Sequence, residues 1–186
     1  LDPIQAAKDE LKARDYLVNE TAMVNAARNG DLEALVLFMQ AGLDANIRNP
    51  FGETPLLAAT TSNNYAAANL LLDLGADINL APGRRDPALV AAAKENNYQM
   101  VMAFLNYDPE IWRLGRDGRS ALWHTVKNGN LDLTQTLIDH EADVNEGDSF
   151  GVSPLILAVQ KGDEAMVLLL LKNGASVDRG NFGGVT

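Results

Sequence analysis

The sequence predicts an all-α fold in which short helix–turn–helix pairs stack on one another as a solenoid. The first observation behind this prediction is a 33-residue period, which relates Leu56, Leu89, Leu122 and Leu155 and extends back to Met23. The second is that other residue types recur in the same register. The small column is Ala26, Ala59, Ala92, Thr125 and Ala158; the polar column is Asp31, Asn64, Asn97, Asn130 and Asp163; the apolar column is Phe38, Leu71, Phe104, Leu137 and Leu170. Such repetition indicates stacked units, since one short helix pair cannot bury its own apolar face.

Each copy is predicted to contain two helices, and residues 52–79 show the signals most clearly. Thr54 is expected to cap the first helix, with Pro55 at its first position, where a missing N–H is harmless. This helix should end near Asn63, and a second should run from Tyr65 to Gly75. An extended finger, residues 76–84, then leads into the next copy. Residues that tolerate a left-handed backbone stand at the matching break in the other copies: Gly30, Asn96, Gly129 and Gly162.

The two ends of the chain differ. Asp2 and Pro3 read as the start of a capping helix, with Ile4, Ala7 and Leu11 on one face. At the other end, "NFGGVT" aligns with the start of an earlier copy, so we expect the array to continue beyond Thr186. A single domain is expected over 1–186, with a cap at 1–16, repeats at about 17–49, 50–82, 83–115, 116–148 and 149–181, and the start of another at 182–186.

These motifs make the chain resemble the ankyrin repeat family over residues 17–186. The family pattern G-x-T-P-L-H-x-A-A, followed later by G-A-D-V-N, is matched by "GETPLLAA", "GVSPLILAV", "GADIN", "GASVD" and "EADVN". The resemblance implies an ankyrin α-solenoid with β-hairpin-like fingers and a role in protein–protein interaction.

Three departures from the family pattern bear on function. The histidine that follows T-P-L is replaced by Leu57, Val90, Trp123 and Ile156, so packing must take over from its hydrogen bonds. The third copy is the most divergent. Asp108 and Glu141 stand where the family has left-handed glycines, which costs stability if that backbone is kept.

Composition disfavours several classes of protein. A net charge of −10 argues against binding to nucleic acid or to an anionic membrane surface. No apolar run approaches the roughly 20 residues of a membrane helix. The chain has no cysteine, and its two histidines, His124 and His140, are not arranged as metal ligands. We therefore expect no cofactor, no metal and a monomer.

An enzymatic alternative arises from "YDPEIWRLGRDGRSALW", Tyr107–Trp123. Asp117, Ser120 and His124 are the residue types of a hydrolase triad, but Ser120 stands one period before the helix cap Ser153. Asp117 and His124 are then expected as finger and inner-helix surface residues. Trp112 and Trp123 are expected to fill space in the scaffold.

The favoured function is a non-catalytic module that binds a protein on the concave face formed by fingers and inner helices. Residues 84–127 hold seven basic and five acidic side chains in an otherwise acidic chain, so an acidic or mixed-charge partner segment is expected. Two readings stay open: finger residues could pair within the scaffold, and the array could be a regulatory or targeting part of a longer enzyme or membrane-anchored protein. The candidate contact residues are Phe51, Glu53, Arg84, Asp86, Lys94, Arg116, Asp117, Arg119, His124, Lys127, Phe150 and Lys161.

Overall fold

The computed structural model describes residues 2–81, 83 and 85–177, and the chain forms two compact units, residues 1–88 and 89–186. Every regular element among these described residues is a helix, as the sequence predicts. The predicted single domain and repeat boundaries stay predictions. Residues 181–186, on which the expectation of a further repeat rests, lie outside the described residues.

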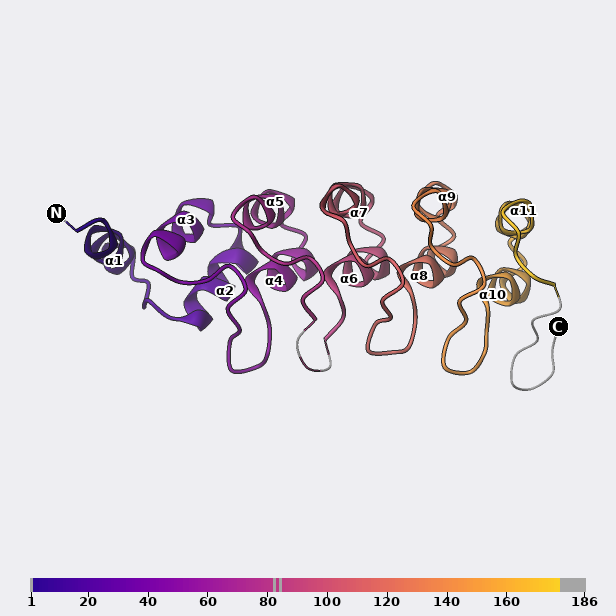
Figure 1. Cartoon of the computed structure of the whole chain (residues 1–186), viewed down its shortest axis with the longest axis horizontal. Helices are drawn as coiled ribbons and strands as arrows, with labels where there is room; N and C mark the ends of the chain where they lie inside the picture. Colours follow the sequence, from indigo (N-terminus) through magenta and orange to yellow (C-terminus); the bar gives the residue numbers. More distant parts are fainter. Residues whose placement is uncertain (1, 82, 84, 178–186) are drawn as a thin grey trace. The chain divides into compact units, whose positions relative to one another are not determined.

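The first unit contains five helices among its described residues, and they pack in two rows (Figure 1). Helix α2 packs on α4, α3 packs on α5, and α1 packs on α3, so α1 covers the first repeat. The bounds are α1 Pro3–Ala13, α2 Glu20–Asn29, α3 Leu32–Gln40, α4 Pro55–Thr61 and α5 Tyr65–Asp73.

The second unit repeats the arrangement. Helix α8 packs on both α9 and α10, and α11 packs on α9 and α10. A finger loop precedes each of the inner helices α8 and α10 (Figure 1). The bounds are α6 Ala88–Lys94, α7 Tyr98–Phe104, the 3₁₀ turn η1 Leu105–Tyr107, α8 Ala121–Asn128, α9 Leu131–Asp139, α10 Pro154–Lys161 and α11 Glu164–Lys172.

Side-chain caps start the helices where the sequence predicts them. The hydroxyl groups of Thr54, Ser120 and Ser153 accept hydrogen bonds from the amide three residues later, at 3.2, 3.1 and 3.3 Å. The polar column caps the second helix of each pair in the same way, at Asp31, Asn97, Asn130 and Asp163. Asn64 is the exception: its amide donates instead to the carbonyl of Arg28 in the preceding repeat.

The break after each first helix is left-handed, which confirms the prediction from residue type. The backbone φ is positive at all five matching positions, namely Gly30, Asn63, Asn96, Gly129 and Gly162. The chain can therefore reverse within two residues and return the second helix along the first.

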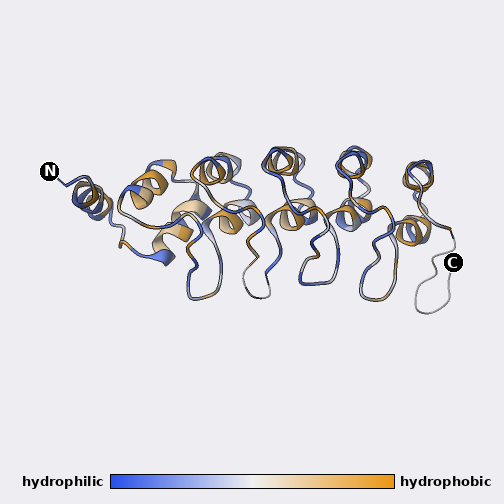
Figure 2. Cartoon of the chain, in the orientation of Figure 1, coloured by the Kyte–Doolittle hydropathy of each residue, from blue (hydrophilic) through white to orange (hydrophobic). Residues whose placement is uncertain are grey.

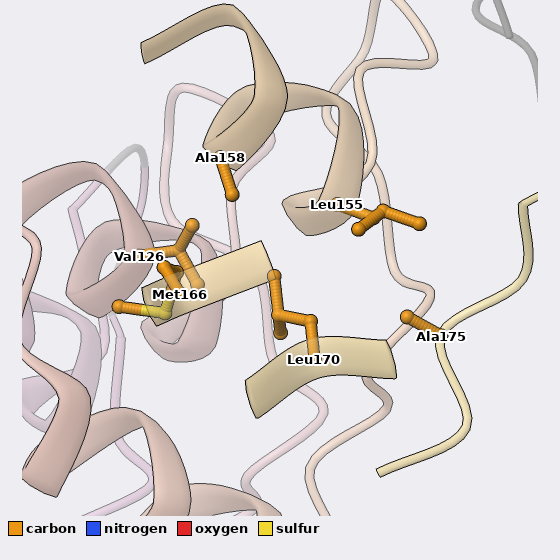
Figure 3. Packing of buried hydrophobic residues seen from close by; sticks show 6 residues of the cluster. All are labelled: Val126, Leu155, Ala158, Met166, Leu170 and Ala175. Atoms are coloured by element: carbon orange, nitrogen blue, oxygen red, sulfur yellow. The ribbon is translucent and has the colours of Figure 1, made fainter. Parts of the chain in front are cut away.

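The core follows the repeat columns. All members of the small column and of the large apolar column are fully buried. In the last two pairs, Val126, Leu155, Ala158, Met166, Leu170 and Ala175 form one cluster (Figure 3). Apolar residues are concentrated in the helices (Figure 2). In the capping helix, Ala7 and Leu11 are buried, whereas Ile4, which was expected on the same face, is 46% exposed.

Asp108 and Glu141 keep the backbone of the glycines they replace. Their φ angles are 47° and 69°, whereas the matching Gly75 and Gly174 have 92° and 85°. Residues with a Cβ avoid this conformation, so both positions lower the stability of the fold.

Replacing Glu141 with glycine should therefore stabilise the chain by about 1 kcal/mol, because glycine adopts a positive φ without strain. The free energy of unfolding from denaturant titration measures this. Gly174→Ala is the matched control: an added Cβ meets no atom within 4 Å, so the variant should lose stability through the backbone alone. A Glu141→Gly variant no more stable than the wild type would contradict the strain at this position.

Candidate partner-binding site

The finger before α10 holds a phenylalanine rigidly in solvent. The carboxylate Oδ1 of Asp148 accepts hydrogen bonds from the amides of Phe150 and Val152, both at 3.0 Å. Gly151 allows the tight turn with a φ of 76°. The Phe150 side chain is 70% exposed. The loop thus orders its backbone without covering the aromatic ring.

The first unit contains the same fingertip. The Asn49 side-chain oxygen accepts from the amides of Phe51 and Glu53, both at 3.0 Å, and Gly52 takes the left-handed position. Arg85 donates to the Phe51 carbonyl at 3.0 Å. The Phe51 ring is 76% exposed. Both predicted phenylalanine positions therefore lie in solvent, and neither is absorbed into the scaffold.

Arg119 joins two fingers within the second unit. Its Nη2 lies 3.2 Å from Asp148 Oδ2, and its Nη1 lies 3.7 Å from Asp117 Oδ2. The guanidinium also stacks 4.1 Å above the centre of the Trp123 ring, a favourable cation–π position. Trp123 is buried and donates from Nε1 to the Val152 carbonyl at 3.1 Å. The scaffold role predicted for Trp123 is confirmed, and Arg119 has a structural function in the same cluster.

His124 is buried rather than on the surface as expected. Its Nε2 lies 3.4 Å from Asp117 Oδ2, but the orientation gives it no hydrogen-bond partner. Burial lowers the pKa of His124; the Asp117 carboxylate opposes this, while Lys94, Lys127 and Arg119 add to it. The ring is therefore neutral near pH 7, and the contact with Asp117 is not an ion pair there.

Ser120 and Asp117, two of the three residues considered as a hydrolase triad, make structural hydrogen bonds. The Ser120 hydroxyl accepts from the Trp123 amide as the cap of α8, as predicted. Asp117 Oδ1 accepts from the Arg119 amide at 3.3 Å within the finger.

Glu53 is also buried, which removes it from any exposed contact surface. Its Oε2 lies 2.5 Å from Arg28 Nη2 in the preceding repeat, and Asn49 contacts the same oxygen at 3.5 Å. This pair links α2 to the next finger. No local sequence pattern predicted this ion pair, because Arg28 and Glu53 are 25 residues apart in the chain.

The remaining candidates are cationic, apart from Asp86. Lys94, Lys127 and Lys161 lie in the last turns of α6, α8 and α10, where positive charge complements the helix carbonyls. Lys161 also donates to the Lys127 carbonyl. Arg116 is exposed, Asp86 is half-buried, and Arg84 lies outside the described residues.

Trp112 was expected to fill space in the scaffold, and this is wrong. Its side chain is 71% exposed, whereas Asn46 and Asn145, at the same register in the first and fourth repeats, bond to the next repeat. Its departure from asparagine was visible in the sequence, but its exposure was not.

The residues that the structure describes include neither a metal site nor a membrane-spanning helix. No group of three or more His, Asp or Glu side chains there could hold a metal ion. No described helix has both the length and the apolar character required to cross a membrane.

His124→Leu should make the stability less dependent on pH, since leucine stands at this register in the next repeat, at Leu157. A histidine whose pKa is lowered by folding stabilises the fold above its unfolded pKa, about 6.5, and loses that contribution as the pH falls below it. Between pH 7 and pH 5 the wild type should lose up to about 1.4 kcal/mol per pH unit more than His124→Leu.

Denaturant titration across this pH range measures the difference. Val126→Ala, a change at a buried residue of the same helix that does not titrate, is the control: it should lower the stability without altering its pH dependence. Parallel curves for the wild type and His124→Leu would contradict a neutral, buried His124.

Comparison with protein-family models gives two matches, at residues 4–81 and 88–181, both to a model described as ankyrin repeats (3 copies). A comparison with curated proteins finds no match. Ankyrin repeats generally serve as protein–protein interaction modules and are typically non-catalytic. The family matches cover most of the chain and coincide with the helix pairs, caps and left-handed breaks described above. The chain therefore belongs to the ankyrin repeat family.

Proposed function

We propose that this chain is a non-catalytic module that binds a partner protein through its fingertips and the adjoining ends of its inner helices. The observation that carries the proposal is the fingertip that holds a phenylalanine in solvent, found at Phe51 and again at Phe150. An exposed aromatic ring costs solubility without adding to the core. A backbone ordered around it avoids loss of conformational entropy on binding.

Exposed basic side chains in the second unit favour an acidic or mixed-charge segment of the partner. Arg116 is exposed in the finger before α8, and Lys127 and Lys161 are exposed in the last turns of α8 and α10. Positive groups on a binding surface attract carboxylates and raise the rate of association more than the affinity. Arg119 contributes less to recognition, because its guanidinium already contacts Asp148, Asp117 and Trp123.

The proposal is tested by recovering the proteins that bind the immobilised chain and measuring the affinity of the purified partner for single variants. Phe150→Ala should weaken binding by at least about tenfold, as expected for a central aromatic contact. Arg116→Glu should weaken it several-fold and reduce its dependence on salt.

Tyr98→Ala is the matched control, because this aromatic residue is exposed at the start of the outer helix α7. It should change affinity by less than about twofold. Equal losses in Phe150→Ala and Tyr98→Ala, or none in Phe150→Ala and Arg116→Glu, would refute the fingertip surface.

A further inference from the structure

An asparagine side chain at one register position of the repeat bonds to the next repeat, at Asn46 and at Asn145. In the first unit, Asn46 accepts from the Asp77 amide at 2.7 Å and donates to the Gly75 carbonyl at 3.3 Å. In the second unit, Asn145 accepts from the Ser176 amide at 2.8 Å. The bond therefore recurs in both units and links residues 31 positions apart.

Trp112 occupies this position between the third and fourth repeats. An indole has one N–H donor and no acceptor, so it cannot accept a hydrogen bond from the amide of Asp143. Asp143 is the residue that corresponds to Asp77 and Ser176 in the other repeats. This joint therefore lacks the hydrogen bond that Asn46 and Asn145 make at theirs.

The backbone at Trp112 nevertheless keeps the geometry of the other repeats. The Arg113 amide donates to the Glu110 carbonyl at 3.0 Å, and the same turn recurs in the other repeats, from Ile47 to Asp44, from Leu80 to Asp77 and from Glu146 to Asp143. On the other side of the joint, Glu141 has the left-handed backbone of Gly174. Asparagine would therefore fit at residue 112, and tryptophan is not required by the fold.

The exposed side chains from Trp112 to Arg116 form a strip. Trp112 is 71% and Leu114 41% exposed, Arg116 is also exposed, and the two residues between them are half-buried. Trp112 lies in the turn closed by Arg113 and Glu110, Arg116 lies in the next turn, and residues 113–115 between the two turns have no regular structure. The Arg113 side chain contacts Glu110 at 3.0 Å, and the Gly115 amide donates to the Arg119 carbonyl at 2.8 Å, which anchors the segment.

We propose that the strip Trp112–Leu114–Arg116 is a docking surface for an acidic segment of the protein partner. The complementary segment carries apolar side chains against Trp112 and Leu114 and a carboxylate against Arg116. Tryptophan and arginine are the residues most enriched at energetically dominant contacts. The inference rests on the proposed function in that the ligand is a protein; Arg116 belongs to both surfaces, whereas Trp112 and Leu114 belong to the strip alone.

Trp112→Asn separates this proposal from a structural role. The variant should raise the melting temperature by about 2–4 °C, since it restores one hydrogen bond to the joint. It should also lower the affinity for the strip's ligand by at least about tenfold. A residue kept for the scaffold would show the opposite pattern, with lower stability and unchanged binding.

The probe is a phage-displayed library of random twelve-residue peptides selected on the whole chain, with single peptides then measured by fluorescence anisotropy. Peptides that combine apolar and acidic residues would support the proposal if Trp112→Asn weakens their binding tenfold and Trp112→Phe retains part of it. Asn145→Trp is the matched control and should lose stability without gaining affinity.

Selected peptides that bind Trp112→Asn as well as the wild type would overturn the proposed docking surface. Failure to select any Trp112-dependent peptide would overturn it as well. If those peptides instead lose affinity in Phe150→Ala, the fingertip surface stands and only the strip fails. If neither variant weakens any selected peptide, both proposals fail. A Trp112→Asn variant no more stable than the wild type would also overturn the strip, because asparagine would then not replace tryptophan in the joint.

Discussion

A pair of helices of seven to ten residues cannot bury its own apolar side chains, and the rest of this structure depends on that constraint. Each pair places small and large apolar residues at 33-residue spacing, so the surface of one pair fits the next. Even the polar Thr125 is fully buried in the small column, where its hydroxyl donates to the Leu122 carbonyl and accepts from Thr134. Stacking thus fixes which side chains are buried, and fingers and loops are left to vary.

Polar side chains form a different set of hydrogen bonds at each junction between neighbouring repeats. Asn64 donates to the carbonyl of Arg28, Asn128 donates to that of Ala93 at 3.0 Å, and Gln135 exchanges hydrogen bonds with Asn173. Buried or half-buried groups need such partners, and each joint meets the need with a different set. One joint can therefore be altered without loss of the fold, which makes room for a residue such as Trp112 that the stacking does not need.

The sequence was sufficient for features that local chemistry decides. Caps at Thr54 and Ser153 and left-handed breaks at Gly30 and Asn96 depend on residues within one turn, so the period and the residue types predicted them. Family membership followed from the same motifs. Burial of Glu53 and His124 was not predictable in this way, because a partner in the preceding repeat or a neighbouring finger decides it. Exposure of Trp112 was missed for the opposite reason: large aromatic residues are usually buried, and no local signal showed that this one has no pocket to fill.

The strained residues Asp108 and Glu141 flank a single repeat, the one that contains α8 and α9. In a linear array each repeat is stabilised by contacts with its neighbours. Strained backbone at both ends of one repeat therefore lowers the free energy needed to unfold that repeat locally. Amide hydrogens in α8 and α9 then exchange with solvent through opening of this segment, before the whole chain unfolds. A protein bound across the segment would slow that exchange, and this repeat would report occupancy even without any change in average structure.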